Sequence, residues 1–288
     1  MRHRLARLLL ALLLCGPLVA LAHPALWVVR QGATTVYLFG TIHVLPAGTA
    51  WRFPALDAAL AKSDALYVEI TDDNAANMAA LVLRYGLDTT QSLSSTLPPF
   101  DRGRLEHAVR LAQVPGGMPA VNLMRPWLAA LTLTVTPLLK AGFDPALGVD
   151  RQLRAQMQAA GKPVRGLETA EEQIRYLADM PTAQQLAFLR ATLRDRDHAG
   201  MDVRKLLAAW LAGDTDTIAQ LENTELREGQ PALYQRLLVT RNATWAARIA
   251  HLLDTPGTVF VAVGAAHLAG PDSVQAQLEK RGIRAQRE

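Results

Sequence analysis

Two histidines in this sequence follow strand-like segments at the same spacing. Residues 34–39 are mostly β-branched and aromatic, and the turn Gly40-Thr41-Ile42-His43 follows them. Residues 258–263 are mostly apolar, and the turn Gly264-Ala265-Ala266-His267 follows. Both compositions are typical of buried strands. The pattern therefore predicts that two imidazoles are delivered to the ends of two strands.

Two carboxylates occupy comparable positions on two further strand-like segments. Residues 65–70 are largely apolar but contain Glu69, and residues 163–168 end in Glu168. In open α/β sheets, ligands bind beyond the carboxyl ends of the strands, where such side chains meet. Imidazoles and carboxylates together suit a divalent ion that lowers the pKa of a bound water and polarises a carbonyl group. The predicted chemistry is metal-assisted hydrolysis.

The predicted metal ligands are His43, His267 and Glu69, and Glu168 is a further candidate catalytic group. Each of these residues also has a purely structural explanation. A histidine after a glycine turn is commonly a turn residue, and an acid near a helix start interacts with the helix dipole. The latter explanation fits Glu168, because the capping box Thr169-x-x-Glu172 follows it directly. The repeated Gly-x-x-His turn favours the functional interpretation.

The elements that position these residues are strands alternating with helices. A hairpin is expected over residues 26–39 with its turn at 31–33, and a second capping box, Thr182-x-x-Gln185, is expected to start a helix. Asp72 and Asp73 are expected to cap another. Helical patterns cover residues 54–62, 74–85, 101–113, 125–139, 147–160, 169–180, 203–211, 216–226, 234–253 and 271–280, and a last strand is expected at 282–284.

This order of elements predicts an α/β fold with a small central β-sheet and a large helical insertion between its halves. No linker-like segment divides the chain, so we expect a single domain over residues 23–288. Residues 127–139 form the longest apolar run after the N-terminus. The run is too short to span a bilayer and contains Pro137, which predicts a buried core helix.

The N-terminus predicts export. Residues 1–22 combine three arginines, an apolar run and the cleavage signal Ala20-Leu21-Ala22, as in a secretory signal peptide. We therefore expect a periplasmic or secreted protein with no stable membrane span after cleavage. Removing this segment lowers the formal net charge from +4 to +1 and removes Cys15, the only cysteine. The small excess of basic over acidic residues that remains does not indicate nucleic-acid binding.

Several common enzyme classes are disfavoured by the motifs. The sequence contains no H-E-x-x-H, no G-x-S-x-G, no phosphate-binding loop of the Walker type and no G-x-G-x-x-G. Zinc proteases with the helical motif, serine hydrolases of the α/β type and nucleotide-binding enzymes are therefore poor matches.

The residues described above resemble the TraB/PrgY/GumN family, which includes the Tiki metalloproteases. The resemblance covers nearly all of the chain after residue 22. It rests on Leu38-Phe39-Gly40-Thr41-Ile42-His43, Tyr67-Val68-Glu69-Ile70 and Val263-Gly264-Ala265-Ala266-His267-Leu268, and more weakly on Arg125-Pro126-Trp127, Gly148-Val149-Asp150, Gly166-Leu167-Glu168-Thr169 and Arg241-Asn242.

The resemblance implies a fold akin to the erythromycin esterase and ChaN groups. It also implies peptide hydrolysis that depends on a divalent ion such as manganese or cobalt, with zinc as a further candidate. His43 and His267 match the two motif histidines, and Glu69 matches the acidic position. Arg241 and Asn242 match a polar pair at the site, with arginine as an oxyanion or carboxylate clamp. The structural alternative for this pair is the surface of a helix.

Three functional hypotheses follow. The first is an exported metal-dependent hydrolase that acts on a peptide or another small acyl substrate. The second is a non-catalytic binding protein that holds a peptide, haem or metal in the same cleft. The third, an accessory factor in polysaccharide export, rests only on the resemblance to GumN.

Overall fold

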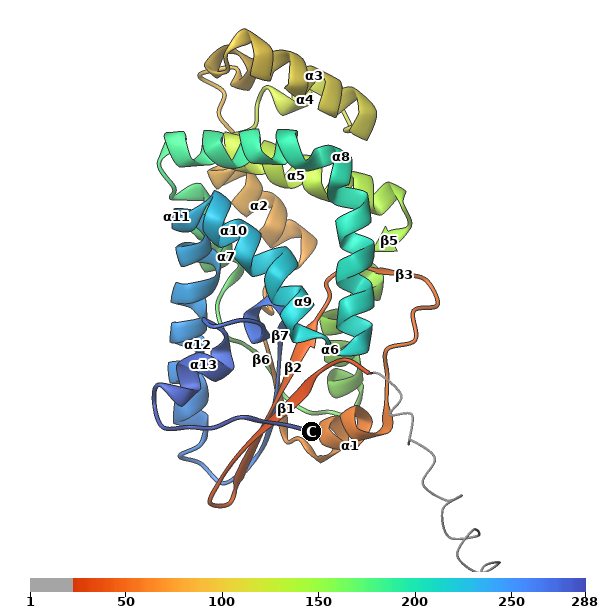
Figure 1. Ribbon diagram of the computed structural model, residues 1–288, viewed down its shortest axis with the longest axis vertical. Coiled ribbons are helices and arrows are strands. Elements are labelled where there is room, and N and C mark those ends of the chain that lie inside the picture. The colour runs from red at the N-terminus through yellow and green to blue at the C-terminus, as the bar shows by residue number, and fades with distance from the viewer. Residues whose placement is uncertain (1–22) are drawn as a thin grey trace, which may run out of the picture.

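The computed structural model describes residues 23–288 and, within that range, the side chains of all residues except 195–201. The predicted signal peptide, residues 1–22, lies outside the described residues. The fold is mixed α/β, as predicted, with a mainly parallel six-stranded sheet between layers of helices (Figure 1).

The central sheet has the strand order β6-β4-β7-β2-β1-β8. Strands β6, β4, β7 and β2 are mutually parallel, β1 pairs antiparallel with β2 in the predicted hairpin, and β8 pairs antiparallel with β1. Two short strands, β3 and β5, pair separately. The strands are β1 (Leu26–Gln31), β2 (Thr34–Thr41), β3 (Leu45–Pro46), β4 (Ala65–Val68), β5 (Phe143–Asp144), β6 (Val164–Gly166), β7 (Gly257–Gly264) and β8 (Gln286–Arg287).

The helices are of very unequal length. They are α1 (Pro54–Lys62), α2 (Ala75–Tyr85), α3 (Pro99–Ala112), α4 (Gly117–Val121), α5 (Pro126–Lys140), α6 (Val149–Ala159), α7 (Ala170–Ala178), α8 (Thr182–Ala212), α9 (Thr215–Ile218), α10 (Glu225–Gly229), α11 (Pro231–Tyr234), α12 (Thr240–Leu252) and α13 (Val274–Glu279). Short 3-10 turns are η1 (Leu93–Thr96), η2 (Pro145–Leu147) and η5 (Ala265–Leu268), and π-helical turns are η3 (Ala219–Thr224) and η4 (Gln235–Val239).

Two hydrophobic cores cover the two faces of the sheet, because side chains alternate along each strand. Tyr37 and Phe39 of β2 point into a core formed with α1, α6 and the end of α8. Val36 and Leu38 of the same strand point into the opposite core, formed with α12 and α13. Trp210 of α8 also donates from Nε1 to the carbonyl oxygen of Gly40 at 2.8 Å. The long helix is thereby fixed to the end of strand β2, three residues before His43.

The helices inserted between β4 and β6 form a further core together with α8, which follows β6 in the chain. Helices α3, α4, α5 and the first part of α8 enclose Leu105, Val109, Val121, Leu133 and Leu189. Figure 1 shows α3 and α4 as the layer furthest from the sheet, and α8 crossing α5 before it turns toward α6. No helix among residues 23–288 has the length and apolarity that crossing a membrane requires.

Several local predictions are confirmed. Helix α1 has the predicted bounds, and Pro54 is its first residue. Thr169 and Glu172 form the predicted capping box at the start of α7. The apolar run 127–139 forms most of α5, and the prediction of a core helix holds for its first half, where Trp127, Ala129, Ala130 and Leu133 are buried, but not for its second, since Leu139 is exposed.

Three local predictions are wrong because tertiary contacts outweigh the local pattern. Gln185 forms no capping box; its Nε2 donates to the carbonyl oxygens of Ala178 and Met180 instead. The cap of α2 is Asn74, while Asp72 accepts a hydrogen bond from the backbone of Ala170 and Asp73 pairs with Arg154. The last strand lies at residues 286–287, where it can pair with β1, rather than at 282–284.

Candidate functional site

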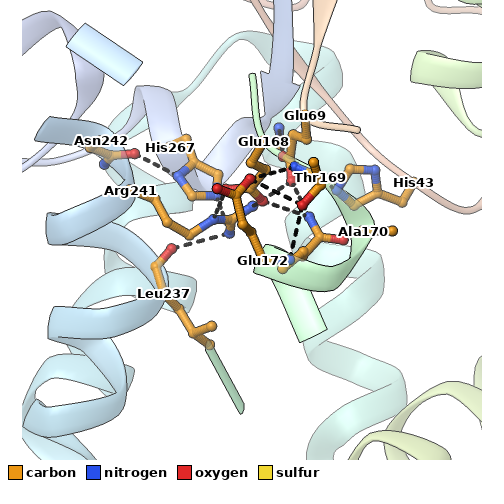
Figure 2. Close-up of polar contacts among 12 residues, drawn as sticks. His43, Glu69, Glu168, Thr169, Ala170, Glu172, Leu237, Arg241, Asn242 and His267 are labelled. Carbon is orange, nitrogen blue, oxygen red and sulfur yellow. Dashed lines mark hydrogen bonds and ion pairs between the residues drawn. The ribbon is translucent and has the colours of Figure 1, made fainter. Parts of the chain in front are cut away.

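The predicted site residues follow the carboxyl ends of four parallel strands that are neighbours in the sheet. His43 follows β2, Glu69 follows β4, Glu168 follows β6, and His267 lies in η5 directly after β7. Figure 2 shows the side chains of these residues gathered around one point, together with Arg241 and Asn242 of α12. The structure therefore brings all six predicted residues to one edge of the sheet.

Arg241 is the hub of this cluster. Its guanidinium group has five N–H donors, and each makes one contact. Nε donates to Glu168 Oε2 at 3.2 Å, and Nη2 donates to Glu168 Oε1 at 2.6 Å and to Glu69 Oε2 at 2.7 Å. Nη1 donates to the carbonyl oxygen of Leu237 at 3.2 Å and to His267 Nε2 at 3.1 Å. The side chain is 7% exposed. With all of its donors bound to protein, Arg241 is fitted to position its neighbours, and a helix-surface role is excluded.

The backbone before Arg241 has an unusual conformation that serves this contact. Leu237 belongs to the π-helical turn η4, which leads directly into α12. Single π turns within α-helices widen the hydrogen-bond ladder and are frequent at functional sites. Here the carbonyl oxygen of Leu237 accepts from the side chain of Arg241, four residues later.

Glu69 is held at both of its oxygens. Oε1 accepts from the backbone N–H of Gly264 at 2.7 Å, and Oε2 accepts from Arg241 and from Gln173 Nε2 at 3.0 Å. Burial opposes the charged form, but the positive charge of Arg241, helped by His43 and the Gly264 N–H, holds the pKa of Glu69 far below its usual range. Glu69 is therefore a fixed carboxylate at any physiological pH.

Glu168 shares Arg241 with Glu69, but its pKa is shifted in the opposite direction. Burial raises the pKa of Glu168, although Arg241 opposes this effect, and the nearby negative charge of Glu69 raises it further. Gln173 Nε2 bridges the two acids by donating to both. Glu168 is thus bonded to other residues of the site and is not only a charge near the start of α7.

His267 is fixed in a neutral tautomer. Because arginine is only a donor, Nε2 of His267 accepts from Arg241, and the ring proton lies on Nδ1, which donates to Asn242 Oδ1 at 2.6 Å. Burial and then the charge of Arg241 lower the pKa of His267 to about 3. Asn242 is itself anchored, since its Nδ2 donates to the carbonyl oxygen of Asp272 at 2.8 Å. The Nε2 lone pair that a metal would need is directed at Arg241.

His43 presents its free nitrogen toward Glu69. Its Nδ1 lies 3.2 Å from Asp150 Oδ1, and its Nε2 lies 3.8 Å from Glu69 Oε1. Burial opposes the charged imidazole, but the hydrogen bond to Asp150 and the charges of Glu69 and Asp150 outweigh it and raise the pKa of His43. The ring remains 58% exposed, so it is accessible to a ligand.

The position of Asp150 depends on a close backbone contact. The backbone N–H of Val149 donates to the carbonyl oxygen of Ile42 at 2.9 Å, and Gly148 lies against the carbonyl of His43, where a Cβ would collide. This contact brings the first turn of α6, which contains Asp150, beside His43. A carboxylate on one imidazole nitrogen fixes the tautomer and leaves the other nitrogen free to bind a ligand.

Gly264 lies where three side chains of the site meet, and its lack of a Cβ lets them approach closely. A Cβ on this residue would lie 3.2 Å from Glu69 Oε1, 3.3 Å from His43 Nε2 and 3.6 Å from His267 Cδ2. His43 Nε2 and Glu69 Oε1 face each other here, and the Asp150–His43 pair resembles the usual outer contact of a metal-bound histidine. These two residues would hold a divalent ion if it displaced the proton that the raised pKa of His43 keeps on Nε2. Among the side chains that the structure describes, no three from His, Cys, Asp or Glu converge as a ready metal site, and Nε2 of His267 is held by Arg241.

A cavity of about 290 Å³ opens beside His43 and Glu69. Thr41, Val68 and Ala262 line it from the sheet. Arg151 and Arg154 of α6 line it from the side, together with Asp73, which pairs with Arg154 Nη1 at 2.7 Å. Arg151 is held less closely, since its Nη2 lies 3.9 Å from Asp73 and its side chain is 52% exposed. The cavity thus combines an apolar floor with a cationic rim.

Three residues of the site were not predicted as such. Asp150 fixes His43, Gln173 bridges Glu69 and Glu168, and Asn223 of η3 donates from Nδ2 to the carbonyl oxygens of Ala266 and Ala269, which flank His267. The Gly148-Val149-Asp150 segment was a signal for the first. Gln173 and Asn223 lie in ordinary helical sequence, where nothing separates them from surface residues.

Replacing Gly264 with alanine tests the close approach at this residue directly. The backbone there (φ −50°, ψ 138°) suits alanine, but its Cβ would press on Glu69 Oε1 and His43 Nε2 at 3.2 and 3.3 Å and push these two groups apart. We expect Gly264→Ala to weaken Mn²⁺ binding by at least about tenfold, measured by calorimetric titration. The control is Gly103→Ala in α3, where a Cβ meets nothing within 4 Å; it should leave Mn²⁺ binding unchanged. Equal affinities in both variants would contradict the assignment.

Comparison with known proteins gives a consistent result. A sequence model of the TraB/PrgY/gumN family matches residues 25–287. The chain is 28% identical over 264 residues to uncharacterized protein YbaP of Escherichia coli (strain K12), covering 88% of this chain and 92% of that protein. It is 23% identical over 276 residues to an uncharacterized protein of Treponema pallidum (strain Nichols), covering 89% and 80%. No solved structure matches the chain.

Proposed function

This chain belongs to the TraB/PrgY/gumN family, and we propose that it is a metal-dependent hydrolase acting on a peptide or a related acyl bond. The observation that carries the proposal is the pair formed by His43 Nε2 and Glu69 Oε1, 3.8 Å apart, at the head of a cavity. An imidazole beside a carboxylate of low pKa is suited to binding a divalent ion, which would displace the proton that the raised pKa of His43 keeps on Nε2 at neutral pH. The predicted signal peptide supports a site of action in the periplasm or outside the cell.

In this proposal His43 and Glu69 would hold the ion. When bound, such an ion supplies Lewis acidity: it lowers the pKa of a water and polarises a carbonyl group. The low pKa of Glu69 suits a ligand better than a general base, because a carboxylate of low pKa takes up a proton poorly. His267 would join the ligand set only if Arg241 released its Nε2.

The other residues of the site would act on these two. Asp150 keeps a proton of His43 on Nδ1, so that Nε2 is the nitrogen that would bind the ion. Arg241 and Gln173 fix the Oε2 atom of Glu69 and turn its Oε1 toward His43. Asn242 orients the ring of His267 by accepting a hydrogen bond from Nδ1, and it is itself anchored to the carbonyl oxygen of Asp272. Arg241 and Asn242 are therefore proposed as positioning residues, and Glu168 as the second anchor of Arg241.

The cavity also bears on the choice of substrate. Its rim contains Arg151 and Arg154 against Asp73, and a further hollow lined by the same three residues with Asn74 and Gln158 lies beside it. Two arginines thus meet one aspartate at this rim, while Glu69 and Asp150 lie with His43 in the rest of the cavity, and Arg151 retains donors that Asp73 does not hold closely. A substrate with a carboxylate, such as a peptide with a free C-terminus, fits this rim best.

The experiment that tests the proposal compares two histidines, each paired with an aspartate. His43 pairs with Asp150, and His251 pairs with Asp254 at 3.0 Å on the surface. We expect His43→Ala to abolish both Mn²⁺ binding and the Mn²⁺-dependent cleavage of a peptide mixture, and His251→Ala to change neither. Retention of an uncleaved peptide by the wild-type protein would instead support the non-catalytic binding protein.

A further inference from the structure

Thr41 is a polar residue on the otherwise apolar floor of the cavity. The floor is formed by Thr41 of β2, Val68 of β4 and Ala262 of β7, three adjacent strands of the sheet. Thr41 is 1% exposed, and its hydroxyl group makes no hydrogen bond to any part of the chain that the structure describes. Valine has nearly the same shape and would complete the apolar floor without leaving a buried hydroxyl group unpaired.

A second threonine of the same strand shows the ordinary arrangement. Thr34, at the other end of β2, is 3% exposed, and its Oγ1 donates to the carbonyl oxygen of Thr255 at 2.8 Å. Buried hydroxyl groups in proteins are generally bonded in this way, because leaving one unpaired is unfavourable. The exception at Thr41 therefore calls for a partner that enters from the cavity.

The position of Thr41 indicates what that partner would be. Thr41 pairs in register with Gly264 of the neighbouring strand. Gly264 lies against His43 Nε2 and Glu69 Oε1. Thr41 is thus one of the residues that line the cavity, as are His43 and Glu69, the two groups to which the reaction is assigned.

We propose that the Thr41 hydroxyl group binds the attacking water of the reaction, accepting a hydrogen bond from it and so orienting the water toward the scissile carbonyl. No covalent bond to Thr41 is made or broken in this role. The inference rests on the hydrolase function proposed above and adds to it a further catalytic residue. It explains why a hydroxyl group is present at a position where packing alone would favour valine.

The test uses Thr41→Val, Thr41→Ser and, as a matched control, Thr34→Val. We expect Thr41→Val to lower kcat by at least about tenfold, to change KM by less than about twofold and to leave the melting temperature unchanged or higher. Thr41→Ser, which keeps the hydroxyl group, should retain kcat within a few-fold of wild type. Thr34→Val should do the opposite of Thr41→Val: it should lower the melting temperature and leave kcat unchanged.

A wild-type kcat in Thr41→Val would overturn the inference, as would a loss of kcat accompanied by a lower melting temperature. A crystal structure of the wild-type protein gives a readout that does not depend on turnover. We expect an ordered solvent or ligand atom within hydrogen-bond distance of Thr41 Oγ1, and a bond from Oγ1 to a protein carbonyl instead would refute the role. If wild type cleaves nothing but the crystal shows that atom, the hydrolase proposal fails while the Thr41 contact stands.

Discussion

Replacing Arg241 with alanine is expected to lower the free energy of unfolding by about 3–5 kcal/mol at neutral pH. The side chain is 7% exposed and is the shared partner of Glu69 and Glu168, which are 9% and 3% exposed. Without it, two buried carboxylates lose the cation that they share, and only the His43 imidazole, 3.8 Å from Glu69, remains as a counter-charge. The ring of Trp245, with its centroid 4.6 Å from the guanidinium carbon, also loses a cation–π contact.

Urea denaturation measures this loss, and a surface ion pair supplies the control. Arg175 pairs with Asp179 at 2.9 Å, but both side chains are about half exposed, at 53% and 44%. Arg175→Ala should therefore cost no more than about 1 kcal/mol. If Arg241→Ala cost no more than Arg175→Ala, Arg241 would not be the hub of the site.

The effect of Arg241 should also depend on pH. The pKa of Glu69 is lowered in the folded protein, so its ionic contribution is fully present above the unfolded-state pKa of about 4.3 and is lost as the pH falls toward the folded value. Arg241→Ala lacks this contribution at every pH. The gap in stability between wild type and variant should therefore be largest near neutrality and shrink below about pH 4. A gap that stayed constant into acid would contradict the assignment of the ion pair.

Replacing Glu69 with glutamine is expected to reduce hydrolysis by at least about a hundredfold. Oε1 accepts from Gly264 N–H and Oε2 accepts from Arg241 and Gln173. The NH2 group of a glutamine would face either the N–H of Gly264 or the N–H donors of Arg241 and Gln173, so one donor would lie against another. The substitution would also remove the anionic charge that faces His43. Both metal binding and the geometry of the site depend on that charge.

Glu168→Gln is the matched control for this variant. Glu168 is as deeply buried as Glu69 and bonds to the same Arg241 and Gln173, but it does not line the cavity. We expect both variants to lose comparable stability in urea, while Glu168→Gln loses much less of the hydrolytic rate, measured with one peptide substrate. Equal losses of rate would mean that Glu69 acts only through folding.

The parallel strands made much of this site predictable. His43, Glu69, Glu168 and His267 all follow apolar segments, and the carboxyl ends of parallel strands meet at one edge whatever surrounds them. The hairpin of β1 and β2 was also predicted, but the order of the six strands was not, because pairing between distant segments does not appear in a local pattern. Local composition was therefore enough to predict that these four side chains lie at the same edge of the sheet.

The contacts that define the site's chemistry were not predictable in the same way. The resemblance placed Arg241 at the site, but its five bonds arise from the approach of α12 after a π-helical turn, which residue pattern does not reveal. The pairing of Asp150 with His43 depends on the backbone contact at Gly148. The two Gly-x-x-His turns look equivalent in sequence, yet they end in an exposed, free Nε2 at His43 and a buried, bonded one at His267.

The central claim is that the chain adds water to an acyl bond at the space between His43 and Glu69. Incubating a peptide mixture and Mn²⁺ with the protein in oxygen-18-labelled water, followed by mass spectrometry, tests it most directly. We predict cleaved products whose new carboxyl groups carry the heavy oxygen, formed by wild type and not by Glu69→Gln. Peptides recovered intact from wild type, or labelled products formed equally fast by Glu69→Gln, would contradict the account.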